Sequence, residues 1–215
     1  MTSVHDVETM FPDMPYMTLQ KALKLDGFIK EHHLTRCLEL GFLHGKSSAF
    51  IAATLSEIGE GHLLTIDRQN ALEHDPNIHQ VLEALDLASW VTVSYEQRSY
   101  NWKLMRLLED ENRPVFDFCY LDAAHTWDDT GLAFFLVDKL LAPNGWMLFD
   151  DLDFRYQKLV KPDQETPDYL VRMGREQRET RQVRKVWELL VKEHPGYGDF
   201  AEDGTWAFAR KLPAS

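Results

Sequence analysis

The stretch CLELGFLHGKSSAF, residues 37–50, joins an apolar run to two closely spaced glycines and two serines. Gly41 and Gly45 enclose three residues, whereas the phosphate-binding pattern G-x-x-x-x-G-K-[ST] has four. The shorter loop argues against a phosphate site, because successive amides must curl around the anion. The dinucleotide pattern G-x-G-x-x-G also fails, because Leu43 stands where the second glycine is needed. The stretch therefore indicates a strand that turns into a helix and binds another kind of ligand.

The residues of this turn have separate expected roles. Gly41 permits a tight turn, Gly45 lets the backbone approach a ligand, and Ser47 or Ser48 caps the helix. Lys46, which gives the stretch its likeness to a phosphate loop, is expected at the exposed start of the helix.

Apolar runs alternate with amphipathic stretches along most of the chain. The predicted strands are 36–41, 62–67, 91–96, 116–122 and 145–151, and the predicted helices are 19–31, 47–58, 76–85, 101–111, 127–141 and one around 183–190. Two short runs split by Asp203-Gly204 predict a terminal β-hairpin. Near-continuous apolar strands suit a sheet that is covered on both faces. The pattern predicts an α/β fold: a doubly wound, Rossmann-like sheet of seven strands, mostly parallel, with a C-terminal antiparallel hairpin.

Length and composition predict a single domain over residues 1–215. Within it, residues 1–34 form an N-terminal helical segment, and residues 153–181 form a connection longer than the fold requires, expected to be a lid or an acceptor-binding insertion. The net charge of −12 argues against nucleic acid or membrane as a partner. The N-terminus has no secretion signal, so a cytoplasmic location is expected. Cys37 and Cys119 stand in apolar runs and are expected to be buried in strands.

An acid, Asp67, ends the second predicted strand, where a carboxylate can accept hydrogen bonds from both hydroxyls of a ribose. The pattern E-x-G-x-x-x-G-x-S followed by this acid resembles the class I S-adenosylmethionine-dependent methyltransferases. The resemblance implies Asp67 on the ribose and the Glu96–Ser99 segment, with Gln97, near the adenine. It also implies cofactor contacts from Glu39, Gly41, Gly45, Ser47 and Asp122. On the residues alone, Glu39 and Asp67 could instead be solvated acids at strand ends.

Three carboxylates, Asp122, Asp150 and Asp151, end the fourth and fifth predicted strands. Parallel strands bring these ends to one side, where the carboxylates would repel one another unless a cation lay between them. A hard divalent ion with oxygen ligands, most simply Mg²⁺, fits these three ligands. One acid could instead bind backbone amides.

The arrangement resembles the metal-dependent small-molecule O-methyltransferases of the sugar, antibiotic and catechol type. That resemblance implies Asp122 as a catalytic metal ligand and His125, in Asp122-Ala123-Ala124-His125, as the general base. Metal coordination acidifies a hydroxyl, and histidine titrates near neutrality, so the pair could activate an acceptor hydroxyl. A structural role for His125, a metal-independent enzyme and a non-catalytic cofactor-binding module remain alternatives.

The acceptor is expected to be a hydroxylated small molecule whose identity the sequence does not give. The segment after Asp151 and the N-terminal segment are expected to form its pocket. Arg155, Tyr156 and Lys158 could hold the acceptor, although the two basic residues could equally form surface ion pairs. A homodimer is a reasonable expectation.

Overall fold

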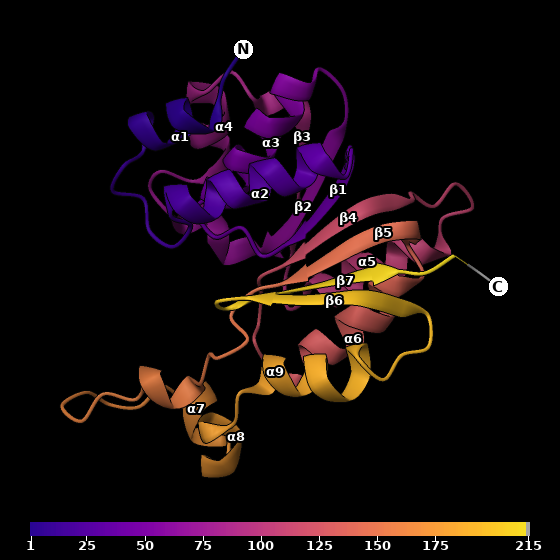
Figure 1. Ribbon diagram of the computed structural model, residues 1–215. Helices are drawn as coiled ribbons and strands as arrows, with labels where there is room; N and C mark the ends of the chain where they lie inside the picture. The colour runs from indigo at the N-terminus through magenta and orange to yellow at the C-terminus, as the bar shows by residue number, and fades with distance from the viewer. Residues whose placement is uncertain (214–215) are drawn as a thin grey trace.

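The computed structural model describes residues 1–213 and contains one seven-stranded sheet (Figure 1). The strands lie in the order β3-β2-β1-β4-β5-β7-β6. Their bounds are β1 Arg36–Leu40, β2 His62–Arg68, β3 Val91–Glu96, β4 Phe116–Leu121, β5 Leu141–Phe149, β6 Tyr197–Asp203 and β7 Trp206–Lys211. The first five strands pair in parallel, and β7 lies antiparallel to both β5 and β6. The predicted Rossmann-like sheet with a terminal antiparallel hairpin is confirmed.

Helices cover both faces of the sheet (Figure 1). One layer contains α1 (Val4–Met10), α2 (Leu19–Glu31), α3 (Lys46–Ile58) and α4 (Ile78–Ala84). The other contains α5 (Tyr100–Glu109), α6 (Trp127–Asp138) and α9 (Gln182–Val186), which continues as a π-helical turn, Trp187–Val191. Successive side chains of a strand pack into two different cores. In β4, Phe118 and Tyr120 pack under the first layer, whereas Cys119 and Leu121 pack under the second. Burial on both sides explains why the strands read as continuous apolar runs.

The two cysteines are free and buried in β1 and β4, as expected. No helix in residues 1–213 has the length and apolar character that a bilayer crossing requires.

The fifth strand begins earlier than predicted. The predicted helix 127–141 ends at Asp138, and Leu141 already pairs with Phe116 at the start of β5. The next regular pair is Phe118 with Trp146, so the Pro143-Asn144-Gly145 turn bulges out of the strand between them. The turn residues therefore interrupt a strand and do not end a helix.

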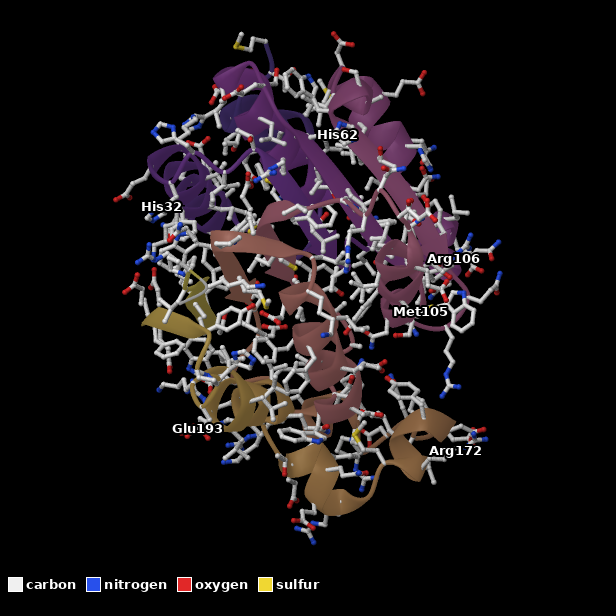
Figure 2. All side chains as sticks on the ribbon, turned by 90° about the vertical axis from the view of Figure 1, so that its right-hand side faces the viewer. His32, His62, Met105, Arg106, Arg172 and Glu193 are labelled. Carbon is white, nitrogen blue, oxygen red and sulfur yellow. The ribbon has the colours of Figure 1, made fainter. Side chains whose placement is uncertain are left out.

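The segment after β5 contains a 3₁₀ turn (Tyr156–Leu159) and two short helices, α7 (Asp168–Arg172) and α8 (Arg175–Glu179). Figure 1 shows α7 and α8 extending away from the sheet beyond α9. In Figure 2, Arg172 of α7 lies at the end of the molecule opposite His62 of β2. The single-domain boundary and the assignment of 153–181 as a lid or insertion stay predictions.

Candidate functional site

The turn after β1 needs both of its glycines for packing within the chain. Gly41 has φ of +91°, and a Cβ atom there would lie 2.3 Å from the carbonyl oxygen of Asp122. Gly45 has φ of +92°, and its Cβ would lie 2.5 Å from Cγ1 of Ile78 in α4. The first glycine brings the end of β1 against the end of β4, at the point where the sheet order reverses. The second makes room for α4, so the space at Gly45 is taken by the chain itself.

Lys46 is buried, so the expectation that it lies at an exposed helix start is wrong. Its side chain is 6% exposed, and its ammonium donates to the carbonyl oxygen of Met14 at 2.9 Å and pairs with Glu8 Oε2 at 3.0 Å. The N-terminal segment therefore lies over the start of α3. The side chain of Lys46 is occupied by contacts to this segment.

The two serines of the turn do not cap α3. The helix begins at Lys46, and Gly45 stands at the cap position without a side-chain hydrogen bond. The Ser48 hydroxyl instead donates to Oε2 of Glu39. Ser47 is 8% exposed and lies on the same turn.

Glu39 is fully buried at the centre of the sheet, facing the start of α3. Besides Ser48, the hydroxyl of Thr65 donates to its Oε2 at 2.6 Å, whereas Oε1 has no hydrogen-bond partner among residues 1–213. Burial raises the pKa of Glu39 to about 7, and the surrounding hydroxyls oppose that rise. A buried carboxylate oxygen without a donor is costly unless a cationic or N–H group from a ligand reaches it.

Asp67 supports the backbone of the turn after β1. Its Oδ2 accepts hydrogen bonds from the amides of Phe42 and Leu43, each at 2.8 Å, and its Oδ1 accepts from the amide of Arg68 at 2.6 Å. Leu43 has φ of 50°, a conformation that these bonds hold in place. The ribose role implied for Asp67 stays a prediction. Gln97 lies in the exposed segment after β3, where its side chain donates to Gln69.

Three potential metal ligands meet at the ends of β4 and β5. Asp122, His125 and Asp151 each offer one ligand atom, and these atoms lie within 4.8 Å of one another; we call these three residues the Asp122 cluster. His125 Nε2 lies 3.4 Å from Asp122 Oδ1 and 3.3 Å from Asp151 Oδ2. Burial lowers the pKa of His125, but the hydrogen bond and charge of Asp122, with the charge of Asp151, raise it overall. Burial raises the pKa of Asp151, and the neighbouring His125 opposes that rise.

The backbone of the Asp122 cluster adopts rare conformations. Ala124, His125 and Asp151 have φ values of 59°, 38° and 57°, in the left-handed region that side chains disfavour. The Tyr156 hydroxyl donates to the carbonyl oxygen of Ala124, and the Phe154 ring packs against His125 with ring centroids 4.8 Å apart. Backbone strain of this kind persists where surrounding contacts hold it, and it concentrates at functional sites.

Asp150 lies outside the Asp122 cluster, although the sequence predicted it as a third ligand. Its side chain is 6% exposed, and Lys21 of α2 donates to both of its oxygens at 3.0 and 3.1 Å. The other donors are the Tyr120 hydroxyl at 2.6 Å, the Thr205 hydroxyl at 3.0 Å and the Asp151 amide at 2.6 Å. Burial raises the pKa of Asp150, but the charge of Lys21 and these hydrogen bonds lower it overall. Metal ligation by Asp150 stays a prediction that these contacts oppose.

Several of these functional contacts were missed from the sequence. Thr65 could have been found, because it is a polar residue inside the apolar run of β2 and lies beside Glu39 in the strand register. Lys21 is 129 residues from Asp150, and nothing in its local sequence marks it. Arg155 and Lys158 are exposed, and only Tyr156 of the three predicted acceptor contacts packs into the site.

A family model described as a methyltransferase domain matches residues 38–152. The chain belongs to this family. The matched range runs from β1 to the residue after Asp151, so it includes the glycine turn, Asp67 and the whole Asp122 cluster. No curated protein matches the chain.

Solved structures of methyltransferases share the fold of this family member. The O-methyltransferase TomG of Streptomyces achromogenes, solved with SAM, is 19% identical with a TM-score of 0.67, covering 98% of this chain and 88% of that one. An O-methyltransferase of Bacillus cereus, solved with SAH, is 17% identical with a TM-score of 0.68, covering 97% and 90%. The SAH-bound methyltransferase PaMTH1 of Podospora anserina is 15% identical with a TM-score of 0.69, covering 98% and 87%. The fold is therefore that of class I SAM-dependent methyltransferases.

Proposed function

We propose that this chain transfers a methyl group from S-adenosylmethionine to a hydroxyl of a small-molecule acceptor, assisted by a divalent cation. The observation that carries the proposal is the placement of the Asp122 cluster. Two carboxylates and an imidazole meet at the carboxyl ends of β4 and β5, and Gly41 of the β1 turn packs directly against the backbone of Asp122. A cofactor on the β1 turn would therefore lie beside a cluster suited to activating a hydroxyl.

The residues around Glu39 fit the cofactor. Oε1 of Glu39 is buried and receives no hydrogen bond from residues 1–213, which suits the ammonium of the methionine part. We propose Gly41, Gly45 and Ser47 along that part, Asp67 on the ribose, Gln97 near the adenine and Asp122 beside the sulfonium. When bound, the cofactor supplies an electrophilic methyl group that is transferred by in-line displacement, so catalysis depends strongly on positioning.

The donor set of the Asp122 cluster fits a hard cation such as Mg²⁺. Asp122 and Asp151 offer carboxylate oxygens, which hard divalent ions prefer. When bound there, the ion would lower the pKa of an acceptor hydroxyl. His125 Nε2 faces both carboxylates, so a proton taken up at that atom is stabilised by their charge. His125 is therefore proposed as the general base.

The acceptor is proposed to lie between the Asp122 cluster and the segment 153–181. Phe154 and Tyr156 supply aromatic surface next to His125, and Arg155 and Lys158 are exposed at the rim. Such a wall suits a small molecule with polar groups. The cytoplasmic location and the homodimer stay predictions.

Calorimetric titration with S-adenosylmethionine, combined with a methyl-transfer assay over hydroxylated metabolites, tests the proposal. Asp122→Asn is expected to reduce turnover by at least ~100-fold, whereas affinity for the cofactor, which Glu39 and Asp67 would also hold, falls by less than about tenfold. Asp117→Asn is the matched control: Asp117 lies near the start of β4 and pairs with Arg36, whereas Asp122 follows the other end of that strand. Absence of cofactor binding by the wild-type chain would overturn the proposal. Turnover by Asp122→Asn at the wild-type rate would contradict the role of the Asp122 cluster.

A metal-independent methyltransferase is the second candidate, because the His125 ring bridges the two carboxylates itself. A protonated imidazole there offsets one of their two negative charges without an ion. A chelator separates the candidates: we expect chelation to reduce turnover and added Mg²⁺ to restore it. Full activity after chelation, with no metal found by elemental analysis, would favour the second candidate.

A further inference from the structure

Asp150 and Asp151 are adjacent acids with different surroundings. Asp151 faces His125 and is 40% exposed at its side chain, whereas Asp150 is buried and contacts Lys21 of α2 and Thr205 in the turn before β7. The Asp150 carboxylate receives three donors on Oδ1 and two on Oδ2, from Lys21, Thr205, Tyr120 and the Asp151 amide. A carboxylate has about four lone-pair positions, so these donors leave no free lone pair for a cation.

Lys21 is the charged donor among these groups. Its ammonium contacts both oxygens of Asp150, lies 3.1 Å from the Thr205 hydroxyl and stands 5.1 Å from the centroid of the Trp206 ring. The ion pair is largely removed from water on the Asp150 side, where the side chain is 6% exposed. Pairs of this kind depend on both partners, because losing one leaves an uncompensated buried charge.

Asp150 is also connected to both carboxylates of the Asp122 cluster. Its Oδ1 accepts from the amide of Asp151, a residue in the left-handed conformation with φ of 57°. The Tyr120 hydroxyl donates to Asp150 at 2.6 Å and lies 3.3 Å from Asp122 Oδ2. The orientation of Asp151 and the surroundings of Asp122 thus both depend on where Asp150 is held.

Charge gives this arrangement a functional consequence. Three free carboxylates around one divalent ion give a net charge of −1, whereas two leave the ion's charge balanced. A third carboxylate ligand weakens the positive field of the ion, so the ion lowers the pKa of a bound hydroxyl less. Holding one of the three acids with an ammonium therefore favours activation of the acceptor over tight retention of the ion.

We propose that Lys21 is a positioning residue of the Asp122 cluster: it holds the Asp150 carboxylate away from the cation and leaves Asp122 and Asp151 as its two carboxylate ligands. The inference deepens the proposed function, and its metal-binding part rests on that proposal. It assigns the acid pair two roles: Asp151 binds the ion, and Asp150 fixes the backbone and side chain of its neighbours.

The test measures Mn²⁺ binding to the full chain by electron paramagnetic resonance, with water-proton relaxation reporting the waters left on the ion. The variants are Lys21→Met, Lys21→Arg, Asp150→Asn and the double variant Lys21→Met/Asp150→Asn. Lys24→Met is the matched control, because Lys24 lies on the same helix and pairs with Asp203 at the surface, away from Asp150. Thermal unfolding and S-adenosylmethionine binding check that each variant is folded.

Lys21→Met is expected to bind Mn²⁺ about tenfold more tightly, with fewer bound waters, because the released carboxylate reaches the ion. Turnover at saturating metal should fall. Lys21→Arg and Lys24→Met should stay within about twofold of wild-type affinity. Asp150→Asn should do the same, because Asp150 offers no free lone pair to the ion and the asparagine oxygen can still accept from the Asp151 amide. The double variant should return to wild-type affinity, an effect that a merely structural role of Lys21 would not produce.

Other outcomes overturn the inference in distinguishable ways. A tenfold loss of Mn²⁺ affinity in Asp150→Asn would make Asp150 a ligand. Unchanged or weaker Mn²⁺ binding by folded Lys21→Met, or a double variant that binds Mn²⁺ as tightly as Lys21→Met, would remove the positioning role. If Lys21→Met does not fold, loss of Mn²⁺ binding by Lys21→Arg or Asp150→Asn would overturn the inference. No Mn²⁺ binding by the wild-type chain would overturn the metal part of the proposed function and this inference with it.

Discussion

The Tyr156 hydroxyl donates a hydrogen bond to the carbonyl oxygen of Ala124, and this bond supports the strained turn that presents His125. Burial raises the pKa of Tyr156 to about 12, so the hydroxyl keeps its proton and stays a donor at neutral pH. Tyr156, in the segment after β5, therefore supports the turn that carries the candidate general base.

Tyr156→Phe removes this bond while keeping the ring. We expect kcat to fall by about tenfold with cofactor affinity unchanged, because His125 loses alignment and the Asp122 cluster is otherwise intact. Steady-state kinetics and calorimetry measure the two effects. Tyr169→Phe is the control, since Tyr169 is 54% exposed on α7. A Tyr156→Phe enzyme with wild-type kcat would show that the turn keeps its shape without the bond.

Glu39 should make stability depend on pH. Its pKa is about 7 in the folded chain and has its ordinary, lower value after unfolding. The folded state therefore holds a proton that the unfolded state has already lost, so the stabilisation is present at low pH and disappears as pH rises through about 7. Glu39→Gln should remove this slope, worth roughly 3 kcal/mol between pH 4.5 and 7. Urea unfolding across that range measures it, with exposed Glu31→Gln as control. An equal pH dependence of the free energy of unfolding in the wild type and in Glu39→Gln would contradict this role of Glu39.

Cofactor binding should release a proton near pH 6. The protonated form of Glu39 predominates below about 7, whereas an ammonium ligand favours the carboxylate. Binding enthalpies measured by calorimetry in two buffers of different ionisation enthalpy should therefore differ in wild type and agree in Glu39→Gln. Affinity for the cofactor should rise as the pH is raised from 6 to 8. An absence of proton release in the wild-type chain would separate Glu39 from the cofactor's ammonium.

Gly41→Ala tests the close approach of β1 to β4. The added Cβ would lie 2.3 Å from the Asp122 carbonyl oxygen, and φ of +91° is unfavourable for alanine. We expect a loss of about 3 kcal/mol in the free energy of unfolding and weaker Mn²⁺ binding, because the backbone of Asp122 must move. Gly59→Ala is the matched control: φ is +84°, and apart from its chain neighbours no atom of residues 1–213 lies within 4 Å of the added Cβ, so a loss of about 1 kcal/mol is expected. Equal losses in the free energy of unfolding of the two variants would exclude a packing role for Gly41.

Lys46→Met should release the N-terminal segment from α3. The variant loses the ion pair with Glu8 and the hydrogen bond to Met14, both nearly buried at the lysine. About 2 kcal/mol of stability should be lost, and limited proteolysis should cut residues 8–18 sooner than in wild type. Lys139→Met, an exposed lysine at the end of α6, serves as control. Unchanged cleavage would contradict a tethering role for Lys46.

The fold could be predicted because its strands are short apolar runs between turn residues, and helix 19–31 was predicted with its observed bounds. The start of β5 was missed because Pro, Asn and Gly in succession are typical of a turn that ends a helix. Here Pro143-Asn144-Gly145 forms a bulge inside a strand. Local sequence does not show that Leu141 has a pairing partner in Phe116.

The candidate site was predictable where strand ends carry acids, as at Asp122 and Asp151. The different surroundings of Asp150 and the burial of Lys46 were not, because both depend on segments brought together from distant parts of the chain. Lys21 and Glu8 stand in ordinary polar helices, and only tertiary packing gives their charges a partner. The ion-pair partners of charged residues near the site could therefore not be predicted from the sequence.

The last strand of the chain, β7, lies between β5 and β6 in the sheet. During synthesis from the N-terminus, β5 therefore keeps an uncovered edge until residues 206–211 have been made. Thr205, which helps hold Lys21 and Asp150 together, is also made only at this stage. A nascent chain lacking its final hairpin has the glycine turn and all the acids of the site but not the full set of donors around Asp150. Completion of the hairpin thus covers the edge of β5 and adds the Thr205 hydroxyl to the donors around Asp150 in a single late event.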